Sequence, residues 1–474
     1  MEKKELKIEN RQAETHSSEH KNVPVLLLIF ALALIVRSLN GYWIGTHLDN
    51  AVIFPSGIYN AFDSLARDIL DGSVSAFWID DISRTSASVY PPGYSLWLTL
   101  IYGFSGIRSA NVVQIVQIFL DSASVLLIVA IGENAFTRRV GVAAGLLAAL
   151  SPLLAIYGAT PLADAPTSWI VLIGVWMLVR AAKTQNMWWP LGAGMMIGAS
   201  CWFRPNGMFL AAFWAAALFL YVSAGWKRKF LLAAPVILGA LILIAPLTVR
   251  NSLAFQVFMP TGMGAGTNLW EGIGETSRAA EFGAIYGDDA LLEQERIELN
   301  LPQDKKVNNY WPDGVKRDRE RMLKALNVIG SHPVWYAGVM ARRMMGHLKF
   351  TGSGSPIYGS SGIHITSESC LPTSWQYFPL TAFVTVLDWI QTAMRFYLLP
   401  LMLVGIALGF RKNARITLVI MVTVFYYLIV GTFMHSEIRY SLPMQAVLFV
   451  FAGIAVVWII ERMRHFTHAQ RGRK

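Results

Sequence analysis

Charged residues and cysteines are both scarce in this sequence. Of its 474 residues only 15% are charged whereas 54% are hydrophobic, and the mean hydropathy is +0.44. A composition this apolar excludes an ordinary soluble enzyme, and the alternation of short strands with amphipathic helices typical of a soluble α/β protein is missing. The two cysteines, Cys201 and Cys370, lie far apart, so neither a disulfide framework nor a cysteine metal site is expected.

Long apolar runs dominate the sequence instead, each of a length that crosses a bilayer and each bounded by short charged patches. This pattern predicts an all-α polytopic membrane protein with about ten transmembrane helices. The expected spans are residues 24–45, 110–132, 140–160, 164–182, 187–203, 205–224, 230–249, 391–410, 416–434 and 441–460.

Basic residues are concentrated in every second connection between these spans. The positive-inside rule places those connections, and both termini, in the cytoplasm of an integral plasma (inner) membrane protein. Topology and anionic lipid then explain the net charge of +10, and no nucleic-acid partner is expected. The residues concerned are Arg138, Arg139, Arg180, Lys183, Lys227, Arg228, Lys229, Arg411, Lys412, Arg415, Arg462, Arg464, Arg471, Arg473 and Lys474.

This topology divides the chain into five parts. The first residues are too acidic for the n-region of a signal peptide, so the chain is expected to begin with a tail. The parts are a cytoplasmic tail (1–22), an N-terminal transmembrane catalytic module (23–250) that includes a first extracytoplasmic loop (46–109), a large extracytoplasmic region (251–390), C-terminal transmembrane helices (391–460) and a basic cytoplasmic tail (461–474).

Both extracytoplasmic regions are expected to contain helices. Residues 91–105 are apolar but too short to span, so we expect them to lie in the outer interface. Charged helical stretches are predicted at Asp288–Leu299 and Lys316–Ile329, followed by an amphipathic juxtamembrane helix over residues 332–347.

Unusual polar residues collect at or just beyond the outer ends of the expected spans. Singly, each has an ordinary interpretation: an arginine at a helix end commonly snorkels, and Asp164 suits a helix N-cap. Arg37, inside the first span, is expected to be paired or to snorkel. The convergence of several such residues on one face indicates a site at the membrane–water boundary. They are Asp49, Asp63, Arg67, Arg84, Asp164, Arg204, Arg250, Glu437 and Arg439.

Glycosyl transfer from a polyprenyl-phosphate sugar fits these residue types. An acceptor hydroxyl needs a carboxylate to take its proton, and the departing lipid phosphate needs fixed cations to stabilise its charge. A single base with no covalent intermediate predicts inversion at the anomeric carbon. No compact Asp/Glu/His cluster occurs in the sequence, so no metal ligand is assigned and metal dependence stays open; the polyprenyl-phosphate sugar is the donor substrate, and no further cofactor is assigned. The candidates are Asp49, Asp63 and Asp164 as catalytic carboxylates, Arg84, Arg204, Arg250 and Arg439 as phosphate ligands, and Tyr90, Asn251 and Glu437 as supporting residues.

Short motifs occur in order along most of the chain. They are Phe62–Gly72, Tyr90-Pro91-Pro92-Gly93-Tyr94, Pro161–Pro166, Phe203-Arg204-Pro205-Asn206-Gly207, Arg250-Asn251 with Gly266–Gly272, and Glu437-Ile438-Arg439-Tyr440 with Pro443. Together they resemble the polyprenol-phosphate-dependent glycosyltransferases of the C superfamily, the protein-mannosyltransferase and aminoarabinose-transferase group. The resemblance implies a lipid-linked sugar donor and an extracytoplasmic acceptor, which is a protein, a lipid or a polysaccharide.

One position departs from the resembling family. There the acidic base sits three or four residues before the aromatic matched by Phe62, where this chain has Ile58 and Tyr59. Either Asp49, just past the first span, or Asp63, just after the aromatic, is left to supply the carboxylate. Asp49 is slightly preferred because of its place in the loop.

Two other functions are compatible with a membrane protein of this kind. A polysaccharide polymerase or ligase would use diphosphate-linked glycans and also needs outer-face arginines. A lipid or solute transporter typically carries ionisable residues near the midplane and repeated halves, whereas here the charges gather at one surface.

The sequence generates a direct test with radiolabelled polyprenyl-phosphate sugars. In lipid-reconstituted protein, we expect Arg250→Ala and one of the two variants Asp49→Asn and Asp63→Asn to lose transfer while remaining folded. Undiminished turnover in both Asn variants would remove the first-loop base.

Overall fold

The computed structural model describes residues 23–47, 58–73, 90–348 and 378–471. All regular structure in these residues is helical, and no strand occurs among them. The predicted all-α class is therefore confirmed.

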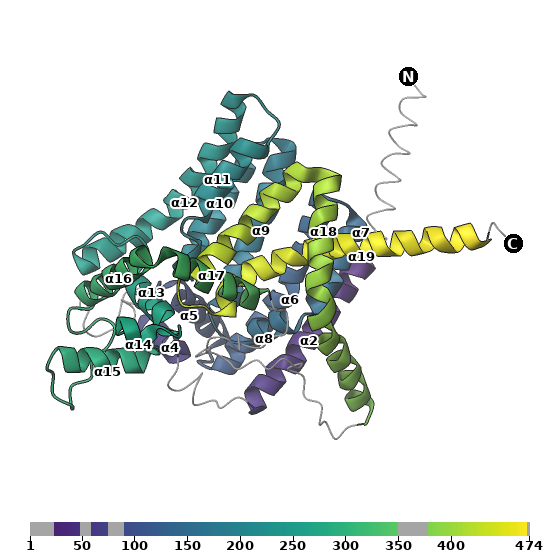
Figure 1. Cartoon of the computed structure of the whole chain (residues 1–474). Helices are drawn as coiled ribbons and strands as arrows, with labels where there is room; N and C mark the ends of the chain where they lie inside the picture. Colours follow the sequence, from purple (N-terminus) through teal and green to yellow (C-terminus); the bar gives the residue numbers. More distant parts are fainter. Residues whose placement is uncertain (1–22, 48–57, 74–89, 349–377, 472–474) are drawn as a thin grey trace.

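Long helices form the bulk of the molecule (Figure 1). A helix lies in each of the ten ranges predicted as spans. Six helices among the described residues are long and apolar enough to cross a membrane, or seven if a bent pair counts as one span, so the number ten stays a prediction. The helices are α2 (Val23–His47), α6 (Ala110–Ala135), α7 (Arg138–Leu150), α8 (Pro152–Ala159), α9 (Asp164–Thr184), α10 (Trp188–Cys201), α11 (Leu210–Tyr221), α12 (Trp226–Phe255), α18 (Phe378–Phe433) and α19 (Leu442–Arg471).

The span predicted at 140–160 is not one straight helix. It is split into α7 and α8, which meet at an angle of 62°. Pro152 has no backbone N–H, so it cannot continue the helical hydrogen bonds of α7 but suits the first position of a new helix. The Ser151 hydroxyl accepts from the Leu154 N–H at 3.3 Å and caps that new helix.

The spans predicted at 391–410 and 416–434 lie within the single element α18. Asn413 interrupts it with non-helical backbone angles (φ −157°, ψ 86°). The Asn413 side chain accepts from the Ile416 N–H at 3.2 Å, as a cap does, so the chain turns there between two helical halves.

Shorter helices from the two regions predicted to be extracytoplasmic gather at the left of the bundle in Figure 1. The three helices predicted at 288–299, 316–329 and 332–347 are present. These short helices are α4 (Ile58–Leu70), α5 (Gly93–Ser105), α13 (Ala265–Gly274), α14 (Ala279–Phe282), α15 (Asp288–Glu298), α16 (Gly314–Ser331) and α17 (Pro333–His347).

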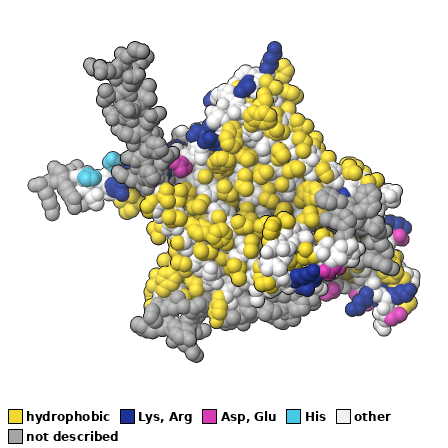
Figure 2. All heavy atoms as spheres, turned by 180° about the vertical axis from the view of Figure 1, so that it is seen from behind, with side chains coloured by type: hydrophobic (Ala, Val, Ile, Leu, Met, Phe, Trp, Pro, Cys, Tyr) yellow, Lys and Arg dark blue, Asp and Glu magenta, His cyan; other side chains and the backbone are white. Residues whose placement is uncertain are grey.

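The surface of the bundle is apolar over a wide area. Figure 2 shows hydrophobic side chains across the middle of the molecule, with most charged side chains at its margins. Large apolar side chains such as Leu28, Ile115 and Leu220 are more than half exposed. A soluble protein rarely exposes a contiguous apolar surface of this extent, so this surface fits contact with lipid.

One ion pair is buried among the apolar helices. Arg37 Nε on α2 lies 2.5 Å from Asp121 Oδ2 on α6, and Trp169 Nε1 on α9 donates to the other carboxylate oxygen at 2.5 Å. Both charged side chains are at least nine-tenths buried. Arg37 is thus paired, which is one of the two expectations from the sequence.

Removing one partner of this pair is expected to destabilise the fold. Arg37→Met would leave the Asp121 carboxylate buried without a cation, a loss of about 3–5 kcal/mol. Thermal unfolding in detergent measures the loss, and Arg37→Met/Asp121→Leu should recover part of it. The control is Arg139→Met, which breaks the exposed pair with Glu461 and should cost under about 1 kcal/mol. Equal losses in the two single variants would contradict a stabilising role of the buried pair.

Candidate functional site

Charged side chains from three separate connections meet at one end of the helical bundle. Asp164 opens α9, Arg204 follows α10, and Glu437 and Arg439 lie between α18 and α19. Arg204 Nη2 donates to Asp164 Oδ2 at 2.7 Å, with the carboxylate almost completely buried. Arg439 forms an ion pair with Glu437. Each arginine therefore has its own carboxylate.

Both arginines also approach the same aromatic ring. The guanidinium carbon of Arg204 lies 5.1 Å from the ring centroid of Tyr440, and that of Arg439 lies 5.3 Å from it. These distances are within the range of a cation–π interaction. The ring thus places two cations in one neighbourhood, and we call Arg204 and Arg439 the arginine pair.

Close backbone contacts explain why Arg204 lies there. The Gly93 N–H donates to the Trp202 carbonyl oxygen at 2.8 Å, and a Cβ at Gly93 would lie only 2.4 Å from that oxygen. Only glycine permits this approach of the Pro91-Pro92-Gly93 segment to the turn before Arg204. On the other side, Asn206 Nδ2 donates to the Tyr440 carbonyl oxygen at 3.0 Å. The motif at Phe203–Gly207 is thereby held between the Tyr90–Tyr94 motif and the Glu437–Tyr440 motif.

Tyr90 lies beside the arginine pair. Burial raises the pKa of the Tyr90 hydroxyl, and the negative charge of Asp288 raises it further, whereas Arg204 and Arg439 act in the opposite direction. The structure therefore brings together five of the residues singled out in the sequence: Tyr90, Asp164, Arg204, Glu437 and Arg439.

Three further residues, which the sequence did not indicate, continue the arrangement. His435 Nε2 lies 3.1 Å from Glu437 Oε1, and His435 Nδ1 pairs with Glu275. Arg343 Nη2 lies 3.0 Å from the other oxygen of Glu275. Arg343, Glu275, His435, Glu437 and Arg439 thus form a line of alternating charge, which we call the buried charge chain.

Within the buried charge chain, the pKa values of His435 and Glu437 favour their charged forms at neutral pH. Burial lowers the pKa of His435, but hydrogen bonds to Glu275 and Glu437 outweigh it and raise that pKa to about 10. Burial raises the pKa of Glu437, but Arg439 and His435 outweigh it and lower that pKa to about 2. His435 is then an imidazolium that is hydrogen-bonded to the side chains of Glu275 and Glu437.

Asp63 is engaged in a neighbouring group of side chains. Its carboxylate accepts from Arg67 Nε at 2.7 Å and from the Tyr102 hydroxyl at 2.5 Å. The adjacent Phe62 packs its ring against those of Tyr90 and Tyr94, with centroids 5.2 and 5.0 Å apart. Helix α4 therefore borders the site through Phe62, while Asp63 faces α5.

The N-cap interpretation of Asp164 is wrong. Ala163 holds the N-cap position of α9, and Asp164 is the first residue of the helix. Its carboxylate pairs with Arg204 instead of capping the backbone. An ion pair across 40 residues of chain has taken the place of a local hydrogen bond.

Arg250 and Asn251 lie buried near the end of α12. Arg250 Nη1 donates to Asn251 Oδ1 at 2.8 Å. Between described residues, no hydrogen bond or ion pair joins these two to the arginine pair. Asp49 and Arg84 lie outside the described residues.

Several polar atoms of the site are buried without a partner among the described residues. They are Asp164 Oδ1, Arg204 Nε and Asn206 Oδ1. Buried polar atoms are normally hydrogen-bonded, so these three are available to a polar ligand. Within the described part of the chain, no group of three or more His, Cys, Asp or Glu side chains is arranged so that it could hold a metal ion.

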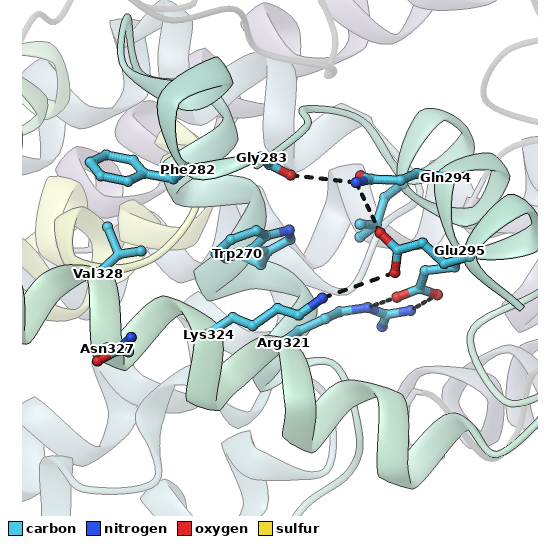
Figure 3. A pocket seen from close by; sticks show the side chains of 11 residues that line it. Trp270, Phe282, Gly283, Gln294, Glu295, Arg321, Lys324, Asn327 and Val328 are labelled. Atoms are coloured by element: carbon cyan, nitrogen blue, oxygen red, sulfur yellow. Dashed lines mark hydrogen bonds and ion pairs between the residues drawn. The ribbon is translucent and has the colours of Figure 1, made fainter.

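A pocket of about 430 Å³ lies among the short helices α13, α14, α15 and α16. Figure 3 shows Trp270 at its centre and Arg321 paired with Glu295. Lys324 Nζ lies 4.0 Å from Glu298 Oε2 on α15. Glu295 also pairs with Arg317, so two arginines of α16 bind one carboxylate of α15. The wall of this pocket thus fixes α15 against α16.

Part of the chain matches a known protein family. Residues 89–249 match the family model of dolichyl-phosphate-mannose-protein mannosyltransferases. The match confirms the family resemblance predicted from the motifs, and it covers Tyr90, Asp164 and Arg204. It ends before the outer helices and the Glu437–Tyr440 segment. No curated protein matches the chain.

Solved structures share the fold at low sequence identity. The archaeal oligosaccharyltransferase AglB from Archaeoglobus fulgidus, in complex with an inhibitory peptide and a dolichol-phosphate, is 13% identical with a TM-score of 0.54, over 96% of this chain and 52% of that one. The oligosaccharyltransferase of the same archaeon in complex with Zn and sulfate is 13% identical in sequence with a TM-score of 0.53. The match covers 93% of this chain and 50% of that one. The chain thus spans about half the length of these proteins. ArnT from Cupriavidus metallidurans bound to undecaprenyl phosphate is 11% identical over 91% and 77%, with a TM-score of 0.39, too low to bear on the fold.

The buried charge chain predicts how stability depends on pH. Glu437, whose folded pKa is depressed to about 2, contributes stability above its unfolded pKa of about 4.3 and loses that contribution as pH falls toward 2. His435, whose folded pKa is raised to about 10, contributes fully below its unfolded pKa of about 6.5 and loses that contribution as pH rises through 10. Thermal unfolding should therefore show greatest stability near pH 5 to 6.

Two variants distinguish the contribution of His435 to the pH dependence of stability from the contributions of other titratable groups. His435→Gln should flatten the decline in melting temperature between pH 7 and 10, while the exposed His465→Gln should leave it unchanged. An unaltered alkaline slope in His435→Gln would show that the imidazolium does not stabilise the site.

Proposed function

We propose that this protein is an inverting glycosyltransferase. It moves a sugar from a polyprenyl-phosphate donor to an acceptor hydroxyl, on the extracytoplasmic face of the plasma membrane, with both termini in the cytoplasm. The observation that carries the proposal is the arginine pair, two cations held near one tyrosine ring at the ends of apolar helices. The family match and the complex of AglB with a dolichol-phosphate support a lipid-phosphate donor.

The arginine pair has the charge that the leaving group requires. As the anomeric C–O bond breaks, the lipid phosphate gains negative charge, which preorganised guanidinium groups stabilise. Asp164 orients Arg204, and Glu437 orients Arg439, so that neither cation must be reorganised during the reaction. Tyr90, Arg250 and Asn251 are supporting residues in this proposal, and acceptor choice falls to the outer helices.

A second candidate is an enzyme that uses a diphosphate-linked glycan. Two neighbouring arginines also suit a diphosphate, and the structures with a shared fold include an oligosaccharyltransferase. The two candidates differ in the donor that supports turnover, and that difference can be measured.

The test is transfer by protein reconstituted in lipid, offered radiolabelled polyprenyl-phosphate sugars in one arm and polyprenyl-diphosphate glycans in the other. Activity is expected in the first arm, with inverted anomeric configuration in the product by NMR. Arg204→Ala and Arg439→Ala should each lower kcat about 10²–10³-fold, the usual cost of losing one donor to a developing anion.

The matched control is Arg108→Ala, which removes an exposed arginine paired with Asp71 and should leave transfer unchanged. Turnover of the diphosphate glycans alone would favour the second candidate. Full activity in both arginine variants would contradict the assignment of the phosphate site.

A further inference from the structure

Two carboxyl groups that the sequence did not single out lie near Tyr90 and His435. Glu271 on α13 is 7% exposed and shares a hydrogen bond with Asp288, the first residue of α15. The charges of both act on Tyr90, as do those of Arg204 and Arg439. We call Glu271 and Asp288 the carboxyl pair.

Backbone contacts position Glu271 toward the buried charge chain. The His435 N–H donates to the Asn268 carbonyl oxygen at 2.8 Å, and a Cβ at Gly272 would lie 2.8 Å from the His435 nitrogen. Arg343 also donates to the Gly272 carbonyl oxygen. Helix α13 is therefore docked directly on the segment that carries Glu437 and Arg439.

Asp288 is positioned by the wall of the outer pocket. Glu295, two turns further along α15, is held by Arg317 and Arg321 of α16. Arg321 Nη1 also donates to Thr267 Oγ1 on α13 at 2.7 Å. These contacts, seen in part in Figure 3, tie α13, α15 and α16 together and fix Asp288 beside Glu271.

The other described carboxylates of the site are already neutralised by cations. Asp63 pairs with Arg67, Asp164 with Arg204, and Glu437 with His435 and Arg439. Among described residues, neither member of the carboxyl pair lies within ion-pair distance of an arginine or lysine. A carboxylate held by a guanidinium is a weak base, whereas one beside a second carboxyl retains affinity for a proton.

These surroundings raise the affinity of the carboxyl pair for a proton. Burial, followed by the negative charge of Asp288, raises the pKa of Glu271 to about 7. Burial also raises the pKa of Asp288, although His435 opposes it. The other charged groups that act on one or both members of the pair are His435, Glu275, Asp289 and Glu437.

We propose that Glu271, positioned by Asp288, is the carboxylate that accepts the proton of the acceptor hydroxyl. This proposal rests on the proposed function, and it supplies the base that is missing at Ile58 and Tyr59. The acceptor oxygen forms a bond to the anomeric carbon while its proton passes to Glu271. The bond from that carbon to the phosphate oxygen breaks, and its electron pair leaves with the polyprenyl phosphate, whose charge the arginine pair stabilises.

Transfer rates measured across pH 5 to 9 test the assignment. Wild-type kcat/KM should rise with pH around pH 7, because Glu271 must be ionised to act as a base. We call this rising part of the pH–rate profile the limb. Neither His435 nor Glu437 titrates in that range. Glu271→Gln should lower transfer about 10²–10⁴-fold while binding of the lipid donor is retained.

Asp288→Asn gives a readout that a merely structural residue would not move. Removing the neighbouring negative charge should shift the limb to lower pH while substantial turnover remains. Glu293→Gln, which removes an exposed carboxylate from the same helix, should alter neither the rate nor the limb.

The outcomes distinguish this proposal from the function on which it rests. If Glu271→Gln keeps transfer within about threefold of wild type, or if Asp288→Asn leaves the limb in place, Glu271 is not the base. Should Arg204→Ala still abolish transfer in that case, the glycosyltransferase function stands without it. Should Glu271→Gln fail to fold, the limb of Asp288→Asn decides. Wild-type protein inactive with every lipid-linked sugar would overturn both.

Discussion

Two like-charged guanidinium groups near one tyrosine ring are the arrangement on which the candidate site depends. Arg204 and Arg439 would repel each other in a weakly hydrated place unless each had a partner of opposite charge. Asp164 and Glu437 provide those partners, and the Tyr440 ring contributes a surface that both cations approach. The cations are therefore held in place before any phosphate arrives, which is the condition for effective electrostatic stabilisation.

The short helices α13 and α17 belong to the same electrostatic network as the long apolar helices. Glu275 of α13 and Arg343 of α17 continue the line of charges that ends at Arg439. Gly272 allows α13 to approach the backbone at His435 without a steric clash. A change in the position of α13 or α17, where an acceptor would approach in the proposed function, would therefore alter the electrostatic environment of Arg439 directly.

Much of the site could be predicted from residue order alone. The residues concerned all lie near the ends of long apolar runs, so the sequence already indicated that they fall at helix ends; they are Tyr90, Asp164, Arg204, Glu437 and Arg439. Glu271, Asp288, Glu275 and His435 carried no such signal. They lie in or next to a long polar region whose charges show no membrane periodicity, so their pairing depends on how α13, α15 and α17 pack.

Hydropathy and helical propensity are local properties, so the sequence by itself determined that the chain is helical, apolar and suited to a membrane. It also placed the polar motifs at helix ends. Only the tertiary structure decided which charges meet, because the partners are far apart in the chain: Arg204 and Asp164 by 40 residues, Arg37 and Asp121 by 84, His435 and Glu275 by 160. Electrostatic energy depends on distance in space, and no local pattern encodes it.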